Sequence, residues 1–595
     1  MTFRAIGHSC PPDGNDLSAS SSTFNPLAWL GRHAVTFSVL GACLVITLCA
    51  ALMRWQPLTT DENDFFLAAA DWLDLRQVIP HPQLYVHLMQ LCFAVWGVTL
   101  DAARLSVLVP NLITVALIPW LVKLVYQDDA RRGSRPAISA LAVWLYALSP
   151  FVIQNSVLID IDNGVLTTAL TLMLCLWFAL KDAPARLRVL ILSLGFAVCL
   201  WFKLPTPPML VVAIALFSAL RGAWRDGGVA VLFGAIGAGL FVGTHTIYSA
   251  LTGYTLAEAA SALIGRTDSL FGGLSEILNR TLQGLGVFVF WIGLPLSALV
   301  LIAGLHSTRR LLGQHLLDED LLISFGLLVI LSYSLLIVPA WGYPRYQAPA
   351  LPVIAIVVSA LVVAHLPRAS RTLWAMLTAT FIFSVAYLFV VVRDPLYDIY
   401  RATFDTAQLA DRLYVGGLAL VRLLPPLIVA FAISILTARR WGLSRSSILI
   451  ATLIATTFGF HVETTAVQVV AGYSTRYRYT YLYADRQRAL EFIQRSVTPS
   501  GFTLTDKDIL FYAHRPGDAI YTYICPTCQP APFIQALRAR RVDAVVWTDK
   551  EWLKAVALNN DPELNSLLDR CYRKHTFGIF TVLVRHDSRA CPDLP

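Results

Sequence analysis

Long apolar runs constrain the fold of this chain more than any other feature of its sequence. Runs of about twenty residues recur from residue 34 to about residue 470, and each is long enough to cross a bilayer as an α-helix. Hydrophobic residues make up 56% of the 595 residues and charged residues only 14%, whereas a soluble protein carries roughly a quarter charged residues. The sequence therefore predicts an α-helical polytopic membrane protein.

The apolar runs predict about thirteen transmembrane helices. We expect these helices at about 34–53, 104–126, 137–156, 163–180, 189–204, 208–221, 228–250, 281–305, 321–339, 347–366, 372–392, 415–437 and 447–469. The first run begins too late for a signal peptide and lacks a small-residue cleavage site, so we expect it to be an uncleaved anchor. Residues 84–97 are apolar but short, and they predict an interfacial helix.

Lys and Arg gather in one alternate set of the short connections between these runs. They are Lys123, Arg131, Arg132, Arg135, Lys181, Arg186, Arg188, Arg221, Arg225, Arg309, Arg310, Arg368, Arg371, Arg439, Arg440 and Arg445. Cytoplasmic loops carry such an excess, so this side is predicted to be cytoplasmic, with the N-terminus inside and the C-terminus outside. The net charge of +8 is mostly this orientation signal, together with the basic C-terminal region. The sequence contains no zinc-finger spacing, phosphate loop or dinucleotide fingerprint, so it gives no support to nucleic-acid binding or ATP-driven roles.

Three regions follow from the distribution of polar and apolar residues. Residues 1–33 are rich in Ser, Pro and Gly and predict a disordered cytoplasmic lead. Residues 34–470 form the membrane body, which includes an outer loop at 54–103, and residues 473–595 predict a small extracytoplasmic α/β domain. In that domain we expect helices at 485–497 and 532–541, and strands at 508–512, 519–524, 542–547 and 577–585.

The ten cysteines divide between these regions. Six lie singly in the lead or the membrane body, whereas Cys525, Cys528, Cys571 and Cys591 all lie in the C-terminal domain. Four cysteines in an oxidising compartment predict two disulfides with three possible connectivities. Our first expectation is Cys525–Cys528 with Cys571–Cys591. Free thiols and a four-thiolate zinc site are the alternatives, although Cys571 and Cys591 are too far apart to form the second close pair that zinc needs.

An acidic stretch, "TTDENDFFLAAADWLDL", follows the first apolar run. Asp61 and Glu62 lie within a few residues of the end of that run, where a charged side chain is costly and usually functional. The apolar residues after them recur at helical spacing and predict an amphipathic helix that lies on the membrane. Asp71 and Asp74 are expected on its solvated face.

Three further polar clusters lie at predicted outer ends of spans. They are Asp160 with Asp162, Lys203 in "WFKLPTPP", and Tyr343, Arg345 and Tyr346 in "WGYPRYQ". Each also has a structural explanation: a helix N-cap for one aspartate, snorkelling for the lysine, and an aromatic belt for the tyrosines. The functional alternative for Lys203 and Arg345 is that they face a cleft and bind a phosphate there. Together the clusters suit catalysis on an anionic, lipid-linked substrate, with a carboxylate as base and cations on a leaving phosphate.

The order of these motifs resembles the membrane-embedded C-type glycosyltransferases that use polyprenyl-phosphate sugars. The likeness is to the branch with protein O-mannosyltransferases, lipid A aminoarabinose transferases and galacturonosyltransferases. The motifs that carry the resemblance are "DE" at 61–62, "HPQLY" at 81–85, "GVTLDAARL" at 97–105, "SPFVIQNSVLIDID" at 149–162, "FKLP" at 202–205 and "RYQAPALP" at 345–352. They cover most of residues 55–365 in order.

The resemblance implies roles for individual residues. Asp61 would be the catalytic base, with Glu62 beside it on the acceptor side. Substrate contacts fall to His81, Tyr85, Asp160, Asp162, Lys203, Tyr343, Arg345 and Tyr346, with the two cations and His81 nearest the lipid phosphate. Two departures stand out: "HPQ" replaces a Pro-Pro pair, and Asp64 with Phe65 replaces an Arg-Tyr pair of the aminoarabinose branch, which argues against that sugar.

The resemblance also implies the reaction and its setting. We expect an inverting glycosyltransferase in a bacterial inner membrane that moves a sugar from a polyprenyl-phosphate donor to an envelope lipid, glycan or protein on the periplasmic side. No nucleic-acid partner and no cofactor are predicted, and a divalent metal is left open. The competing class is a transporter or lipid flippase, which would carry its ionisable groups near the middle of the membrane in repeated halves.

Overall fold

The structure, a computed structural model, describes helices and strands in both the membrane body and the C-terminal region. It describes residues 26–54, 60–71, 81–127, 132–260, 274–313, 315–336, 344–366, 371–391, 424–429, 431–432, 435, 444–471, 483–497, 502–505, 520–523, 542–548, 562–578 and 580–586. Tyr343, Cys525, Cys528 and Cys591 lie outside these residues, as do the predicted strand at 508–512 and the predicted helix at 532–541.

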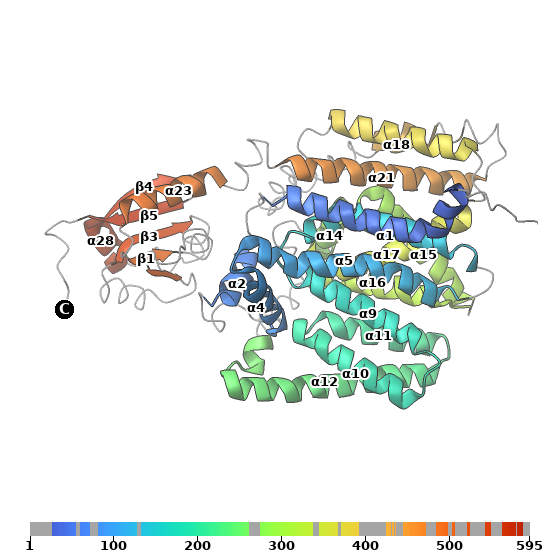
Figure 1. The fold of residues 1–595 in the computed structure, drawn as a ribbon, viewed down its shortest axis with the longest axis horizontal. Helices are drawn as coiled ribbons and strands as arrows, with labels where there is room; N and C mark the ends of the chain where they lie inside the picture. Colours follow the sequence, from blue (N-terminus) through green and yellow to red (C-terminus); the bar gives the residue numbers. More distant parts are fainter. Residues whose placement is uncertain are drawn as a thin grey trace, which may run out of the picture.

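Most of the described chain is a bundle of long helices that lie side by side (Figure 1). Among the described residues, seven helices are long and apolar enough to cross a membrane, or eight if one bent pair counts as a span. The seven are His33–Leu52 in α1 (Pro26–Leu52), α5 (Leu100–Val125), Asp162–Ala179, which joins η1 (Asp162–Leu166) to α9 (Thr167–Ala179), α10 (Ala185–Phe202), α12 (Trp224–Thr252), Arg345–His365, which joins η4 (Arg345–Ala350) to α17 (Leu351–His365), and Arg445–Val469 in α21 (Arg445–Ala471). The polytopic helical fold is confirmed.

The other predicted spans appear as shorter or more polar helices. They are α7 (Arg135–Ala147) with α8 (Pro150–Asn155), α11 (Thr206–Leu220), α16 (Asp318–Leu336) and α18 (Arg371–Val391). α16 carries three acidic residues in its first turn. Leu148 and Ser149 separate α7 from α8, which begins at Pro150 because proline favours the first turn of a new helix. Most of the predicted span at 415–437 lies outside the described residues.

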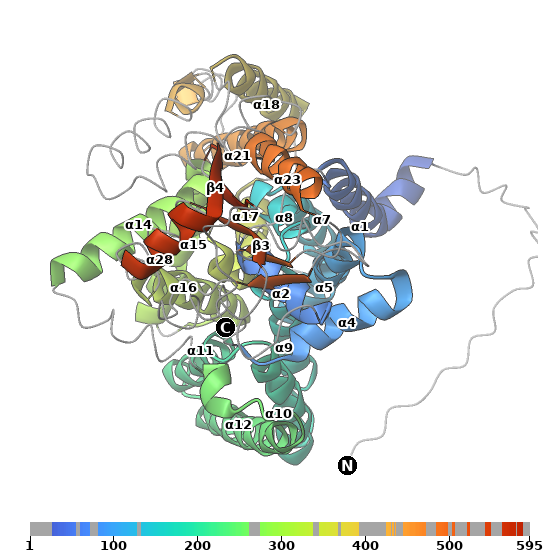
Figure 2. The same ribbon diagram turned by 90° about the vertical axis from the view of Figure 1, so that its left-hand side faces the viewer.

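One predicted span, 281–305, is broken into two helices. α14 (Leu274–Ile292) and α15 (Leu294–Leu312) meet at Gly293 with a bend of 109°. Gly293 has φ +87°, a left-handed conformation that glycine tolerates, and Pro295 lies in the first turn of α15. A Cβ at position 293 would lie 2.7 Å from a ring carbon of Phe460, so the close packing of α21 also requires glycine. As a result, α14 runs across the end of the bundle (Figure 2).

The acidic stretch forms α2 (Thr60–Ala69), which packs on α4 (Leu84–Trp96). Phe65 and Phe66 are buried, and their rings lie 5.0 Å from Tyr85 and 5.1 Å from Phe93 between centroids. The apolar face of α2 therefore contacts protein, whereas the sequence predicted a helix lying on the membrane. Both helices lie at one end of the bundle, on the side of the C-terminal domain (Figure 1).

The C-terminal region holds a five-stranded sheet of order β2-β1-β3-β5-β4. Its elements are α23 (Tyr483–Ser496), β1 (Phe502–Thr505), β2 (Ile520–Tyr523), β3 (Val542–Thr548), α28 (Pro562–Cys571), β4 (Tyr572–Phe577) and β5 (Phe580–Arg585). β1 pairs in parallel with β2 and β3, and β5 pairs antiparallel with β3 and β4. Leu490 and Ile493 of α23 pack with Val546 and Val582 of the sheet in a small core. The sequence predicted α23, β2, β3 and β5, but not β1 or β4.

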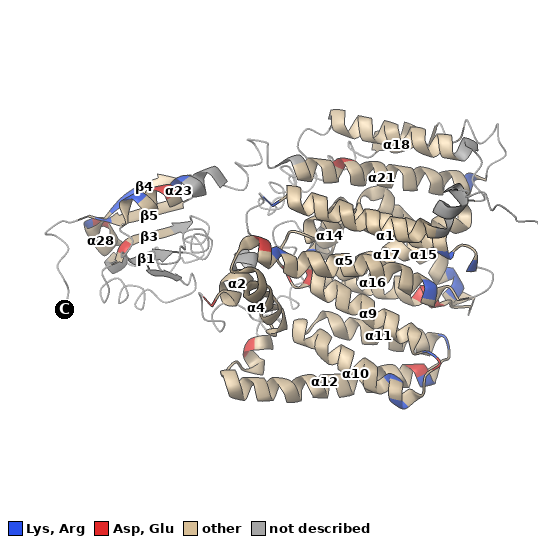
Figure 3. Ribbon diagram, viewed as in Figure 1, with Lys and Arg blue, Asp and Glu red and all other residues tan. Residues whose placement is uncertain are grey.

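Charged residues of the bundle gather at its ends. Figure 3 shows Lys and Arg concentrated at the end farthest from α2, α4 and the sheet. We call this the basic end. It carries Lys181 and Arg221 in the turns after α9 and α11, Arg186 in the first turn of α10 and Arg310 in the last turn of α15. The opposite end holds α2, α4 and the candidate site described below, and we call it the site end.

Candidate active site

Four charged side chains meet in two ion pairs at the site end. Asp160 and Asp162 come from the junction of α8 and η1, Lys203 caps α10, and Arg345 begins η4. Lys203 Nζ contacts Asp162 Oδ2, and Arg345 Nη1 lies 3.0 Å from Asp160 Oδ2. The residues are far apart in the sequence, and the packing of η1 against η4 and α10 brings them together.

The local sequence explains how the two aspartates are held. Asp160 Oδ1 accepts a hydrogen bond from the backbone N–H of Asp162 at 3.0 Å, and Asn163 Nδ2 donates to the Leu158 carbonyl at 3.1 Å. The chain then forms a π-helical turn, a feature that often marks functional positions. A Cβ at Gly164 would lie 2.7 Å from the Val107 carbonyl oxygen, so glycine permits this turn to pack closely on α5.

The two cations are surrounded by aromatic rings. Lys203 Nζ lies 4.0 Å from the centroid of the Tyr346 ring, which stacks on Tyr333 at 5.3 Å between centroids. Arg345 Nη2 donates to the Tyr346 hydroxyl at 3.0 Å. Cation–π contacts stabilise a lysine most when it is desolvated, and Lys203 is only 2% exposed. The aromatic rings therefore supply part of the stabilisation that water would give an exposed ammonium group.

Burial makes the cluster sensitive to charge. Asp160 and Asp162 are 4% and 1% exposed, and the two carboxylates balance the two cations. Removing one partner of such a pair leaves an uncompensated buried charge, which is strongly destabilising. Asp162 Oδ1 and Asn163 Oδ1 are buried and accept no hydrogen bond from the described residues. Buried acceptors without donors call for an explanation, and a bound hydroxyl group or water would satisfy them.

Asp61 and Glu62 belong to the first turn of α2, and nothing is described of their side chains. α2 lies at the same end of the bundle as the four charges (Figures 1 and 2). Tyr85 is fully buried beneath it, and its hydroxyl lies 3.0 Å from Ser106 Oγ of α5. Tyr85 thus fastens α4 to α5, and its role in substrate binding remains a prediction.

His81 lies in the segment just before α4, and its backbone is anchored. The His81 carbonyl accepts hydrogen bonds from Gln83 Nε2 at 2.9 Å and from the Tyr254 hydroxyl at 3.2 Å. Burial raises the pKa of Tyr254 to about 12, so this hydroxyl stays protonated and donates. Tyr254 follows Gly253, a left-handed residue at the end of α12, so the end of α12 positions the segment that carries His81.

The structure adds site residues that the sequence interpretation missed. Tyr333 stacks on Tyr346, and its hydroxyl forms a hydrogen bond with Thr206 Oγ1. A tyrosine inside the apolar run of α16 and a threonine between prolines were the available signals, because polar groups within spans usually have a partner or a function. Tyr254 carried no comparable signal.

Of the four cysteines in the C-terminal domain, the structure describes Cys571. Cys571 is disulfide-bonded, and the other cysteines among the described residues are free, so its partner lies outside them. The expected pairing of Cys571 with Cys591 therefore remains a prediction. Within the described ranges, no three His, Cys, Asp or Glu side chains are grouped so that they could hold a metal ion.

The sequence matches no known family model and no curated protein. The structure, however, is similar to two solved structures of ArnT from Cupriavidus metallidurans. With ArnT bound to undecaprenyl phosphate, the TM-score is 0.56 at 13% sequence identity, over 95% of this chain and 99% of ArnT. With ArnT in the apo state, the TM-score is 0.56 at 13% identity, over 93% of this chain and 98% of ArnT. The likeness extends over nearly the whole chain, so the predicted fold of the C-type glycosyltransferases is confirmed.

Proposed function

We propose that the protein is an inverting glycosyltransferase that moves a sugar from a polyprenyl-phosphate donor to an extracytoplasmic acceptor, which is an envelope lipid, a glycan or a protein. One observation carries this proposal: Asp160, Asp162, Lys203 and Arg345 form a buried cluster at the end of the bundle that also holds α2. The fold supports it, because ArnT, which shares the fold, has been solved with undecaprenyl phosphate bound.

The charge balance of the cluster suits a phosphate that gains charge during the reaction. A polyprenyl-phosphate sugar is a phosphodiester with one negative charge, and the leaving polyprenyl phosphate carries nearly two. Lys203 and Arg345 are held in place by Asp162 and Asp160, so they are oriented before the donor binds. Their interaction with the phosphate strengthens as its charge grows, which is the differential binding that lowers a reaction barrier.

In the proposed reaction, Asp61 takes the proton of an acceptor hydroxyl. The acceptor oxygen then attacks the anomeric carbon from the face opposite the phosphate. A new carbon–oxygen bond forms there while the bond to the phosphate oxygen breaks, and polyprenyl phosphate leaves with the electron pair. Glu62 lies beside Asp61 on the acceptor side. For an acceptor that is already a phosphate, Asp61 would orient the nucleophile instead of deprotonating it.

The proposed setting is a bacterial inner membrane, with the site end and the C-terminal domain on the periplasmic side. The concentration of Lys and Arg at the basic end supports this orientation, since cytoplasmic loops carry an excess of these residues. A polyprenyl-phosphate donor reaches such a site through the bilayer, so no nucleotide-sugar site is needed.

Mass spectrometry of envelope lipids and glycans tests the proposal. Cells that lack the gene should lose a hexose, pentose or uronic acid from one envelope component, and the wild-type gene should restore it. The Asp61→Asn variant should be made in normal amounts and should not restore it. Identical lipid and glycan profiles with and without the gene, under conditions in which the protein is produced, would overturn the proposal.

A further inference from the structure

A second charged cavity lies at the basic end, away from the candidate active site. Its volume is about 120 Å³, and it lies among the ends of α9 and α11 and the starts of α10, α12 and α16. Its charged lining consists of Lys181, Arg188, Arg221, Asp226 and Asp318. The proposed glycosyl transfer uses none of these residues.

Positive charge is in excess in this cavity. Lys181 and Arg221 both pair with Asp318, the lysine at 3.5 Å, and Arg188 Nη1 lies 2.7 Å from Asp226 Oδ1. Three cations thus face two carboxylates, which leaves a surplus of one positive charge among the lining residues. A singly charged anion would bring the cavity to neutrality.

Arg188 gives a second, independent indication of a ligand. The residue is only 6% exposed, and its guanidinium carbon lies 4.6 Å from the centroid of the Trp177 ring. Its Nε is buried and donates to no acceptor in the described part of the chain. Arginine presents its N–H groups as a planar fork that matches the oxygens of a phosphate, so a phosphate in the cavity would supply the missing acceptor.

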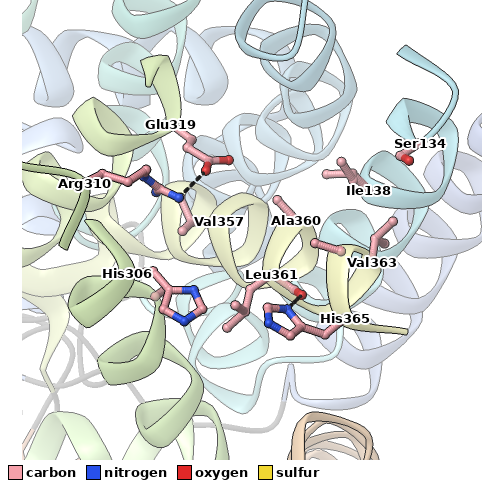
Figure 4. A pocket seen from close by; sticks show the side chains of 12 residues that line it. Ser134, Ile138, His306, Arg310, Glu319, Val357, Ala360, Leu361, Val363 and His365 are labelled. Carbon is pink, nitrogen blue, oxygen red and sulfur yellow. Dashed lines mark hydrogen bonds and ion pairs between the residues drawn. The ribbon is translucent and has the colours of Figure 1, made fainter. Parts of the chain in front are cut away.

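A larger cavity at the basic end serves for comparison, because the charge of its arginine is balanced. This cavity, of about 370 Å³, is lined by Arg310, Glu319, His306 and His365 among other residues (Figure 4). Arg310 lies 3.0 Å from Glu319 and also pairs with buried Asp320. Two carboxylates already balance the single positive charge of Arg310, so this cavity has no comparable surplus of positive charge to bind an anion.

Apolar side chains next to the smaller cavity indicate the source of the phosphate. Leu187 and Leu190 lie in the first two turns of α10 with Arg188 and are 44% and 58% exposed. Leu220 ends α11 and Trp224 begins α12, with exposures of 52% and 72%. In a membrane helix, exposed leucines face acyl chains, and tryptophan is enriched at the level of the headgroups. A phosphate in the cavity therefore lies where a phospholipid places its headgroup.

We propose that this cavity binds the phosphate of an anionic phospholipid from the leaflet at the basic end. Arg188, Lys181 and Arg221 contact the phosphate oxygens, and the acyl chains lie along the exposed leucines of α10 and α11. Basic pockets between transmembrane helices recognise acidic lipid headgroups in this way.

Native mass spectrometry of the full-length protein tests this site. The purified protein is titrated with dioleoyl phosphatidylglycerol, with dioleoyl phosphatidylcholine, and with inorganic phosphate. The wild type should bind one phosphatidylglycerol in preference to phosphatidylcholine. Arg188→Gln and Lys181→Gln should each weaken that binding about fivefold, the scale of one cation at a charged membrane surface. Lys181 is 52% exposed at its side chain, so its variant tests the site even if the Arg188 variant folds poorly.

The matched controls are Arg186→Gln and Arg225→Gln, which remove the same charge from the same end but do not line the cavity. Both should bind phosphatidylglycerol as the wild type does. Equal weakening in controls and cavity variants would mean diffuse surface attraction and would overturn the site. Equal affinity for the two lipids would overturn the charge argument. A phosphate adduct that displaces the lipid would show a soluble anion to be the ligand and would overturn the lipid source.

Discussion

The two ends of the helical bundle hold similar charged side chains in different physical settings. At the site end, Lys203 and Asp162 are 2% and 1% exposed, and cations and carboxylates balance. At the basic end, the side chains of Lys181 and Asp226 are 52% and 40% exposed, and cations outnumber carboxylates in the smaller cavity.

This difference shows that the degree of burial of an ion pair determines whether it can hold a fixed geometry or exchange partners. A buried, balanced cluster depends on every member, because an unpaired charge inside the protein is costly. It therefore holds its cations in one geometry, which suits catalysis. An exposed pair contributes little to stability and exchanges partners with water. At the basic end, the exposed Lys181 can consequently adjust to a headgroup at little cost in stability, whereas Arg188 is buried and held against Trp177.

The largest effect should follow from breaking the balance at the site end. Lys203→Ala leaves Asp162 buried without its partner, and we expect a loss of about 3–5 kcal/mol in stability. Thermal unfolding in detergent measures this loss, with Lys181→Ala as the exposed control. The double variant Lys203→Met with Asp162→Leu should recover most of the stability but no transfer activity. Equal unfolding temperatures for the two single lysine variants would contradict the contrast between the ends.

Asp61→Asn should lower the rate of transfer without lowering the stability of the protein. The substitution keeps the size of the side chain and removes the proton acceptor, so turnover should fall by about 10²-fold or more. The unfolding temperature should stay unchanged, unlike that of the Lys203 variant. Asp71→Asn is the control, because Asp71 is exposed and asparagine tolerates its φ of 59°. Transfer rates from a polyprenyl-phosphate sugar extract measure both, and near-normal turnover of the Asp61 variant would remove it as the base.

Arg345→Lys should have an intermediate effect. Lysine keeps the charge beside Asp160 but loses the planar fork that also reaches the Tyr346 hydroxyl. We expect roughly a tenfold loss in kcat/KM for the donor, which corresponds to about 1.4 kcal/mol. Steady-state kinetics with the donor varied will measure it. Wild-type kinetics would show that only the charge of Arg345 matters.

The smallest effect should come from the basic end. Lys181→Gln removes an exposed side chain that is 3.5 Å from Asp318, so stability should change by less than about 0.5 kcal/mol. Glycosyl transfer should remain at the wild-type level. Unfolding and transfer assays on the same preparation will test this, and a loss of transfer without added lipid would show that the two ends are coupled.

Some of the site could be predicted from the sequence because charges at the ends of apolar runs are conspicuous. Asp160, Asp162, Lys203 and Arg345 were all selected on that basis, and the structure brings them together. The stacking of Tyr333 on Tyr346 was not predictable, since it depends on the packing of α16 against η4. The burial of Phe65 and Phe66 was not predictable either, because a helical apolar stripe faces lipid or protein equally well.

The sequence by itself determined the membrane class, the approximate positions of most helices and the sorting of Lys and Arg to one end. These properties are local, since they depend on the length of each apolar run and on the charges beside it. Only the tertiary structure decided which carboxylate pairs with which cation, because Lys203 and Asp162 are 41 residues apart and meet through packing. It also decided the 109° bend at Gly293, where the approach of Phe460 from α21 leaves room for glycine alone. An apolar run specifies its length and hydrophobicity, but its path depends on the helices that pack against it.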